Sequence, residues 1–228
     1  HLYYLPNFLP IIESLKSRDG YEIFVSMPQY MQKRERNLFY NATNDLGLEL
    51  ISADLEKDRI EKIKSKNFDV IIVGNVGQLA KIVSEATIAV MVYHGIGLKQ
   101  SYYNDIDSRI NIRSVESESR YKTLTAQGHQ NLALTGYTKL DPLFSVNEQE
   151  KLVTKNILGI DNHLPTLLYA PTFYPTSFDN LASELEYLSS EFNIIIKLHN
   201  FSWFQQRYIY QSKLAQEIES RSENVYLL

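Results

Sequence analysis

The sequence predicts an α/β fold in which parallel strands alternate with helices. Short apolar runs rich in β-type residues recur along the 228-residue chain, and segments with helical spacing of apolar residues lie between them. The run at 68–74 is apolar on both faces, which is typical of a strand buried inside a parallel sheet. Strand–helix–strand alternation with short connections places helices on both faces of such a sheet. We therefore expect two α/β units, joined near 141–146.

The composition is that of a folded globular chain. Hydrophobic residues make up 44% and charged residues 22%, which excludes a disordered protein. The formal net charge of -4 argues against dominant contacts with a nucleic-acid backbone, so we expect no nucleic-acid partner. The chain has no cysteine, which eliminates disulfide, zinc-thiolate and thiol chemistry and fits a cytoplasmic location. No apolar run reaches the roughly 20 residues that cross a bilayer.

The first unit is expected over residues 1–144. Its apolar runs predict strands at 1–5, 21–27, 48–52, 68–75 and 87–93. Because the chain begins inside an apolar segment, we expect it to start part-way through a strand. Phe8, Ile12 and Leu15 recur at helical spacing, which predicts a helix directly after that strand.

The second unit is expected over residues 145–228. Ser145 and Glu148 have the spacing of a capping box ahead of an apolar helix, and Gly159 stands where such a helix would end. A unit of this length is short for a complete doubly wound domain, so we expect the second domain to be incomplete. The remaining pattern predicts strands at 166–170, 193–198 and 224–228, with helices at 178–190 and 202–222.

A histidine, two glycines and a lysine directly follow the strand predicted at 87–93. In a parallel sheet, the carboxyl ends of the strands open onto the ligand crevice. Gly95 and Gly97 allow the backbone to approach a ligand closely, His94 can move a proton near neutral pH, and Lys99 can neutralise phosphate. The alternative, a glycine turn beside a histidine that only caps a strand, stays open.

Polar residues also follow the apolar run at 132–134. Gly136 again permits close approach of the backbone to a ligand, and Lys139 supplies a cation. Asp141 is followed by proline, which marks a reversal of the chain. Taken alone, this segment fits an interdomain linker.

The first two strands of the second unit also end in groups that suit phosphate. Pro171 and Thr172 follow the strand at 166–170, where the threonine hydroxyl and nearby amides can hold an anion. Lys197 and His199 end the strand at 193–198 with a cation and a second strand-end histidine. We found no paired-histidine metal motif and assign no metal ligands.

Taken in order, these segments resemble the motifs of the CDP-glycerol glycerophosphotransferase family, whose members build teichoic acids and related capsular polymers. The resemblance runs from about residue 66 to about residue 200, and the earlier part of the chain matches at fold level only. Family members have two Rossmann-like domains facing a cleft, the GT-B arrangement, and bind nucleotide mainly through the second domain. The motifs are His94-Gly95 with Lys99, Gly136 with Lys139 and Asp141, Tyr169-Ala170-Pro171-Thr172, and Lys197 with His199.

The resemblance implies a transferase that moves glycerol phosphate, or a similar polyol phosphate, from a CDP-linked donor to an acceptor hydroxyl and releases CMP. His94 would be the catalytic base, and His199 would contact the donor phosphate. The partners would be CDP-glycerol or a related CDP-polyol and a polymer or lipid-linked acceptor, met by peripheral association with the inner face of the membrane. We assign no cofactor, although a divalent cation is compatible with this chemistry. The implied substrate-binding residues are Gly95, Gly97, Lys99, Gly136, Lys139, Asp141, Pro171, Thr172 and Lys197.

Departures from the family's pattern keep other functions open. Tyr174 and Asn200 stand where the family usually has arginine and proline. The same scaffold also serves nucleotide-sugar glycosyltransferases and 2-epimerases, which would prefer UDP-sugars to CDP-polyols. A non-catalytic, degenerate binding module would bind nucleotide without releasing CMP.

Overall fold

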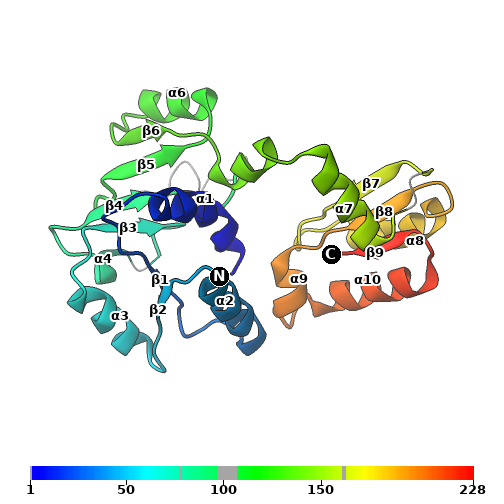
Figure 1. Cartoon of the computed structure of the whole chain (residues 1–228), viewed down its shortest axis with the longest axis horizontal. Coiled ribbons are helices and arrows are strands. Elements are labelled where there is room, and N and C mark those ends of the chain that lie inside the picture. The colour runs from blue at the N-terminus through cyan, green and yellow to red at the C-terminus, as the bar shows by residue number, and fades with distance from the viewer. Residues whose placement is uncertain (1, 78, 97–106, 161–162) are drawn as a thin grey trace. The chain divides into compact units, whose positions relative to one another are not determined.

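The computed structural model describes residues 2–77, 79–96, 107–160 and 163–228. These residues form two compact units, His1–Ser145 and Val146–Leu228, whose helices and strands are labelled in Figure 1. Among the described residues, the paired strands of both units run parallel to their neighbours. The predicted α/β class with parallel sheets is therefore confirmed.

The first unit contains a two-stranded and a four-stranded parallel sheet. Strands β1 (Phe24–Ser26) and β2 (Glu49–Ile51) form the small sheet. The larger sheet has the order β3-β4-β5-β6, so the carboxyl ends of its four strands lie along one edge. Its strands are β3 (Val70–Val73), β4 (Ile88–Met91), β5 (Ile112–Val115) and β6 (Leu132–Leu134). Among the described residues of this unit, the helices are η1 (Leu2–Tyr4), α1 (Leu5–Lys16), α2 (Lys33–Asp45), α3 (Glu56–Ser65), α4 (Leu79–Ile82), α6 (Glu118–Ala126) and η2 (Thr138–Phe144).

The prediction of a strand at 1–5 is wrong, because the chain is helical from Leu2 onwards. A short 3₁₀ turn, η1, leads into α1. Pro6 lies in the first turn of α1, where its missing N–H is not needed, whereas a proline inside a sheet removes a ladder hydrogen bond. Leu5 and Ile12 are buried two helical turns apart, so the helical stripe begins earlier than the sequence pattern indicates.

The pattern did not predict β5 and α6. Arg113 and Ser114 interrupt β5 with polar side chains, so this strand has no apolar run to mark it. The structure nevertheless buries both residues, with 2% and 9% exposed, because β5 pairs with β4 on one side and β6 on the other.

The second unit has one parallel sheet with the order β7-β8-β9, formed by Thr166–Tyr169, Asn193–Ile196 and Val225–Leu227. Its core is apolar and continuous: Phe178, Ile194 and Ile196 are fully buried, and Ile218 is 1% exposed. The helices are α7 (Glu148–Leu158), α8 (Phe178–Leu188), α9 (Asn200–Phe204) and α10 (Ile209–Arg221).

The capping box of α7 lies two residues later than predicted. Asn147 accepts a hydrogen bond from the Glu150 N–H at 2.9 Å, and the Glu150 carboxylate accepts one from the Asn147 N–H at 3.0 Å. Ser145 instead donates its hydroxyl proton to the Pro142 carbonyl at 2.9 Å, in the last turn of η2. Gly159 ends the helix in the left-handed region, with φ of 69°, as predicted.

The helix predicted at 202–222 is broken into α9 and α10. Gln205 adopts an extended conformation between them. The break allows Phe201 and Tyr208 to pack against Phe173, with ring centroids 4.9 and 5.0 Å away. In a continuous helix, these two residues would lie on one face but about two turns apart along the axis. The interruption brings both side chains to the same ring.

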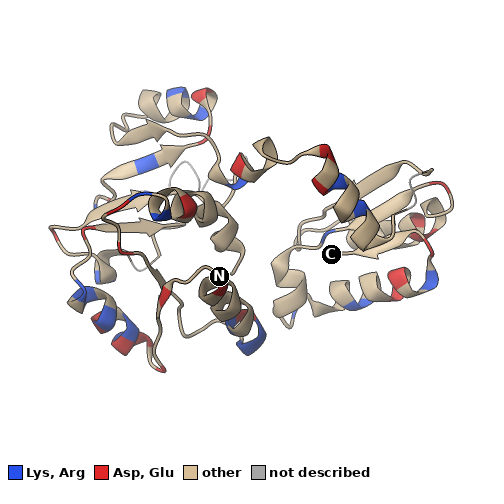
Figure 2. Ribbon diagram, viewed as in Figure 1, with Lys and Arg blue, Asp and Glu red and all other residues tan. Residues whose placement is uncertain are grey.

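Acidic and basic side chains are interspersed on the helices of both units. Figure 2 shows this along α3 in the first unit and α10 in the second, where neither sign forms a continuous stripe. Across the described ranges, no helix combines the length and apolar character needed to cross a membrane.

Candidate functional site

In the first unit, the candidate catalytic residue His94 follows β4 at the carboxyl edge of the sheet. Its Nδ1 lies 2.8 Å from the carbonyl oxygen of Gly74, which follows β3. A carbonyl oxygen has no proton to give, so Nδ1 carries the proton and donates it. In the neutral ring the lone pair therefore lies on Nε2, which is the state that a general base requires.

Two tyrosines from η1 hold the imidazole ring of His94. The ring of Tyr4 lies 4.5 Å from the imidazole centroid, and that of Tyr3 lies 5.5 Å away in an edge-on arrangement. The Tyr4 hydroxyl accepts a hydrogen bond of 2.6 Å from Asn75, which follows Gly74. The orientation of His94 is thus fixed by residues from the start of the chain and from the end of β3.

Asn7 in α1 joins three parts of this edge and was not predicted from the sequence. It is fully buried, and its Nδ2 donates to the carbonyls of Tyr4 at 3.3 Å and His94 at 3.5 Å. The carbonyl of Asn7 accepts the Thr138 hydroxyl proton at 2.6 Å, and the Tyr137 hydroxyl donates to the His94 carbonyl at 3.3 Å. Since Asn7 and His94 lie 87 positions apart, no local pattern could have revealed their contact.

The other residues predicted near His94 have different outcomes. Gly95 adjoins the histidine and is half-buried, whereas Gly97 and Lys99 lie outside the described residues. Lys139 and Asp141 are exposed on η2, and no hydrogen bond or ion pair links them to His94 in the described part of the chain.

Gly136 adopts a φ of +78° at the end of β6, a conformation that side chains disfavour. A Cβ at this position would meet nothing within 4 Å, so the glycine serves backbone conformation here and leaves open space beside it. It lines a shallow hollow at the ends of β4, β5 and β6, shared with Val92, Tyr93, Ile96, Ser114, Glu116, Tyr137 and Thr138.

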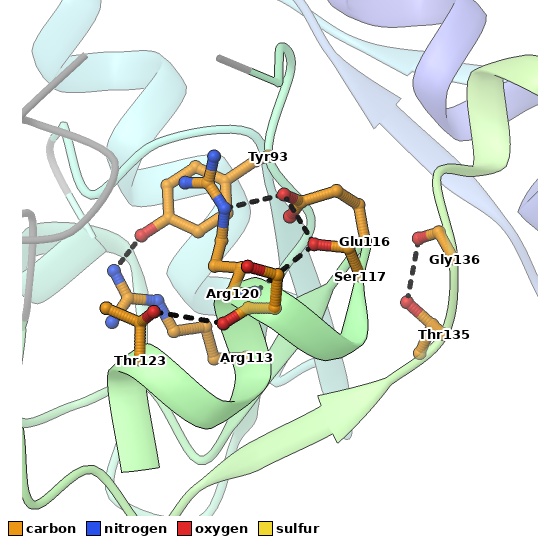
Figure 3. Close-up of polar contacts among 9 residues, drawn as sticks. Tyr93, Arg113, Glu116, Ser117, Arg120, Thr123, Thr135 and Gly136 are labelled. Carbon is orange, nitrogen blue, oxygen red and sulfur yellow. Dashed lines mark hydrogen bonds and ion pairs between the residues drawn. The ribbon is translucent and has the colours of Figure 1, made fainter. Parts of the chain in front are cut away.

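A polar network includes Tyr93 and Glu116, two residues that line this hollow (Figure 3). Glu116, directly after β5, accepts a hydrogen bond of 2.6 Å from the Nε of Arg120 in α6. Ser117 caps α6 by accepting a hydrogen bond from the Arg120 N–H at 3.3 Å. Arg113 donates to the Tyr93 hydroxyl, and its guanidinium lies 5.1 Å from the tyrosine ring. Tyr93 ends a predicted strand, but the sequence offered no signal for its partners, which lie on or beside β5 and α6, the two elements that were not predicted.

In the second unit, His199 follows β8 and forms the N-cap of α9. Its Nδ1 accepts a hydrogen bond of 3.1 Å from the N–H of Phe201. Because Nδ1 uses its lone pair, the proton of the neutral ring lies on Nε2. The ring of Phe173, from the segment after β7, lies 4.7 Å from the imidazole. His199 therefore offers a hydrogen-bond donor where His94 offers an acceptor.

The remaining predicted residues of the second unit also lie at its strand ends. Thr172 and Lys197 are exposed, and Pro171 is half-buried. The Lys197 N–H donates to the Tyr169 carbonyl at 2.9 Å, which keeps the segments after β7 and β8 side by side. These positions are compatible with the predicted phosphate contacts, which stay a prediction.

Gln211 anchors the segment after β7 and was not predicted. This residue of α10 is 1% exposed, and its Nε2 donates to the Phe173 carbonyl at 2.9 Å. Ser202 of α9 donates its hydroxyl proton to the Gln211 Oε1 at 2.5 Å. The side-chain amide thus fixes the backbone beside His199, through contacts that no short motif encodes.

The residues that the structure describes contain no group of three or more His, Asp or Glu side chains that could hold a metal ion. The described residues therefore provide no set of ligands for the divalent cation that the chemistry would allow.

Comparison with known proteins connects the chain to nucleotide-sugar epimerases at the level of fold. A UDP-GlcNAc 2-epimerase from Neisseria meningitidis, solved with UDP-GlcNAc bound, matches 100% of this chain with a TM-score of 0.55 and 14% identity; the match covers 69% of that protein's length. A protein assigned as a UDP-N-acetylglucosamine 2-epimerase, from Listeria monocytogenes, matches 100% with a TM-score of 0.55 and 11% identity, over 65% of its length.

These structures are GT-B-like, so the predicted GT-B-like α/β class is confirmed as a fold. No family model and no curated protein matches the chain. Both of these solved structures carry the name of a 2-epimerase, and neither is a glycerophosphotransferase.

Proposed function

We propose that this chain belongs to an enzyme that acts on a nucleotide-linked substrate, with a nucleotide-sugar as the leading class. The observation that carries this proposal is the likeness of all 228 residues to UDP-GlcNAc 2-epimerases. The reaction would be 2-epimerisation or glycosyl transfer, both of which need a positioned proton acceptor and charge stabilisation near a diphosphate.

The two strand-end histidines suit different roles in this reaction, one as a proton acceptor and the other as a hydrogen-bond donor to phosphate. His94 can accept a proton at Nε2, because its Nδ1 proton is committed to the Gly74 carbonyl at 2.8 Å. His199 can donate from Nε2 to a phosphate oxygen, because its Nδ1 accepts from Phe201 at 3.1 Å. The exposed ammonium of Lys197 supplies a cation at the same strand end as His199.

A second candidate is transfer of a polyol phosphate from a CDP-linked donor. It is favoured by the order of residues along the chain, from His94 through Gly136 and Thr172 to Lys197 and His199. Phosphoryl transfer also depends mainly on positioning and charge neutralisation, so the same histidines and lysine suit it. The two candidate substrates differ in the nucleobase, uracil or cytosine, and in the group attached to the diphosphate.

A thermal-shift panel with UDP-GlcNAc, UDP, CDP-glycerol and CMP separates these candidates. A ligand at about 100 times its Kd stabilises the folded protein by about 2.7 kcal/mol, which corresponds to about 5–10 °C for a protein of this length. We expect the largest shift with UDP-GlcNAc. A shift with CDP-glycerol alone would favour the second candidate, and the absence of a shift with every nucleotide would contradict both.

Two matched variants test where the nucleotide binds. Lys197→Ala should reduce the shift, whereas Lys213→Ala, which removes an exposed lysine of α10, should not. A nucleotide that stabilises the protein but is never turned over would instead support a non-catalytic binding module.

A further inference from the structure

A cavity of about 270 Å³ lies at the amino ends of β3 and β4, at the opposite edge of the large sheet from His94. Residues directly before these two strands line it, together with side chains of α3 and α4, which lie side by side in Figure 1. Its lining shares no residue with the hollow beside His94. The volume is close to about 300 Å³, the lower end of the range for ligand pockets in proteins.

Most of the cavity wall is apolar. Ile63 of α3 is 5% exposed, and the ring of Phe68 packs on that of Phe24 with centroids 5.2 Å apart. Water between such walls lacks hydrogen-bond partners, so an apolar group that displaces it gains affinity. The apolar lining residues are Ile63, Phe68, Ile71, Ile82 and Val83.

The wall formed by the segment before β4 is held by its own hydrogen bonds. Arg109 donates to the carbonyl oxygens of Ser84 and Thr87, at 2.7 and 3.0 Å. The hydroxyls of Ser84 and Thr87 are hydrogen-bonded to each other at 2.9 Å. The carboxylate of Asp107 accepts the Arg109 backbone N–H at 2.8 Å. Because these contacts exist before a ligand binds, little ordering of this wall opposes binding.

The mouth of the cavity carries the ammonium group of Lys64, at the end of α3. Two other lysines near this end of the chain segment have partners: Lys62 donates to the Ser52 carbonyl at 3.0 Å, and Lys66 pairs with Glu49 at 3.3 Å. Lys64 is exposed and forms no ion pair or side-chain hydrogen bond with any residue that the structure describes. Its charge is therefore available to an anionic ligand.

Asn67 adds a second hydrogen-bond donor at the mouth. It turns the chain from α3 into β3 with a φ of +48°, a conformation that asparagine tolerates. Within the described ranges its side-chain amide forms no hydrogen bond. An ammonium and an amide N–H together suit a carboxylate, which only accepts hydrogen bonds.

We propose that this cavity binds a small amphipathic carboxylate. Its hydrocarbon part packs between α3 and α4, and its carboxylate accepts hydrogen bonds from Lys64 and Asn67. The proposal is independent of the proposed function, because it uses none of the residues assigned to the nucleotide-linked substrate.

Two other occupants fit the cavity less well. A sugar would bury its hydroxyls against apolar walls that offer them no partners. A helix of a partner protein is about 10 Å across with its side chains, which is too wide for a cavity of about 270 Å³.

Methyl signals in two-dimensional NMR spectra test the proposal on the unmodified chain. During titration with sodium octanoate below its micellar concentration, the signals of Ile71 and Ile82 should shift and saturate. The signal of Ile194, in the core of the second unit, should not shift. Sodium hexanoate should bind about 16-fold more weakly, because each buried CH₂ changes the Kd about fourfold. No shift at Ile71 and Ile82, equal shifts at Ile194, or equal affinity of the two acids would overturn the proposal.

Matched variants locate the carboxylate. Lys64→Gln should raise the Kd for hexanoate about two- to fivefold, the range of an exposed ion pair, and should leave the Kd for hexan-1-ol unchanged. Lys57→Gln, which removes another exposed lysine of α3, should change neither Kd. Equal weakening of the acid and the alcohol in Lys64→Gln, or the same effect in both variants, would contradict the contact between the carboxylate and Lys64.

Filling the cavity tests the position of the hydrocarbon part. Val83→Phe places a larger side chain on the wall and should raise the Kd for octanoate about tenfold or more, because the space for the hydrocarbon is lost. Cooperative thermal unfolding of the variant shows that it is folded. An unchanged Kd in the folded variant would count against the proposal, and if the variant does not fold, the titrations of the unmodified chain decide.

Discussion

His94 in the first unit and His199 in the second each follow a buried parallel strand by a few residues. His94 donates its Nδ1 proton to a carbonyl, whereas His199 uses Nδ1 to accept a backbone N–H. The two rings therefore present opposite groups at Nε2, an acceptor in the first unit and a donor in the second. Each motif has a histidine shortly after a buried strand, but the backbone group that contacts Nδ1 gives the two rings different hydrogen-bonding roles.

The groups around the two histidines differ too, with acceptors beside His94 and cations beside His199. The hollow beside His94 is lined by side-chain oxygens that accept hydrogen bonds, including the Glu116 carboxylate. The segment around His199 has the exposed cation of Lys197 and, close to two tyrosine rings, that of Arg207. We expect these cations to favour phosphate at the strand ends of the second unit.

Replacing the base should have the largest effect. His94→Ala should lower turnover of the nucleotide substrate by about 10²–10⁴-fold, because general-base assistance is lost, and should leave nucleotide binding almost unchanged. Steady-state kinetics with the nucleotide identified by the thermal-shift panel measure this. His129→Ala, in the connection before β6, is the matched control. Near wild-type turnover in His94→Ala would show that the base lies elsewhere.

Removing the anchor of the second site should destabilise the protein. Gln211→Leu should lower the free energy of unfolding by about 1–3 kcal/mol, because the half-buried Phe173 carbonyl and the buried Ser202 hydroxyl lose their partner. Urea denaturation measures the loss. Gln216→Leu, an exposed position in the same helix, should change the free energy of unfolding by less than about 0.5 kcal/mol. Equal effects would mean that the buried amide has no special role.

Neutralising the strand-end cation of the second unit should have a smaller effect. Lys197→Ala should weaken nucleotide binding by about tenfold at low ionic strength, and less in high salt, because the exposed ammonium is screened. Isothermal titration calorimetry at two salt concentrations checks both parts. If Lys139→Ala in the first unit weakened binding more than Lys197→Ala, the assignment of phosphate to the second unit would be reversed.

Replacing a residue that caps a helix should have the smallest effect on stability. Ser117 caps α6 with one hydrogen bond of 3.3 Å, whereas Asn147 and Glu150 form a reciprocal pair at the start of α7. Asn147→Ala should cost about 1 kcal/mol of folding stability. Ser145→Ala, at the position the sequence pattern favoured, should cost less in the same thermal unfolding experiment, and a larger loss there would place the cap at Ser145.

The sequence predicted best where one local pattern decides the structure. β3 and β4 follow from continuous apolar runs, and the end of α7 follows from Gly159. β5 was missed because Arg113 and Ser114 are polar yet buried, which depends on pairing with two neighbouring strands. The spacing of apolar residues along the chain does not reveal which strands pair.

The candidate sites divide in the same way. Strand-end position alone singled out His94, Gly136 and His199. Asn7 and Gln211 were missed because their contacts span 87 and 38 positions and depend on buried side-chain amides. The sequence therefore identified where chemistry can occur, while the protonation of each histidine required the partners that the fold brings to it.

The direct test of the opposite histidine roles is a long-range ¹H–¹⁵N NMR spectrum of the imidazole rings at a pH where both are neutral. We predict that His94 is protonated at Nδ1 and His199 at Nε2, so their Nε2 signals should fall at opposite ends of the imidazole nitrogen range. Variants His94→Ala and His199→Ala assign the signals. The same tautomer at both histidines would contradict the division between a proton acceptor in the first unit and a hydrogen-bond donor in the second.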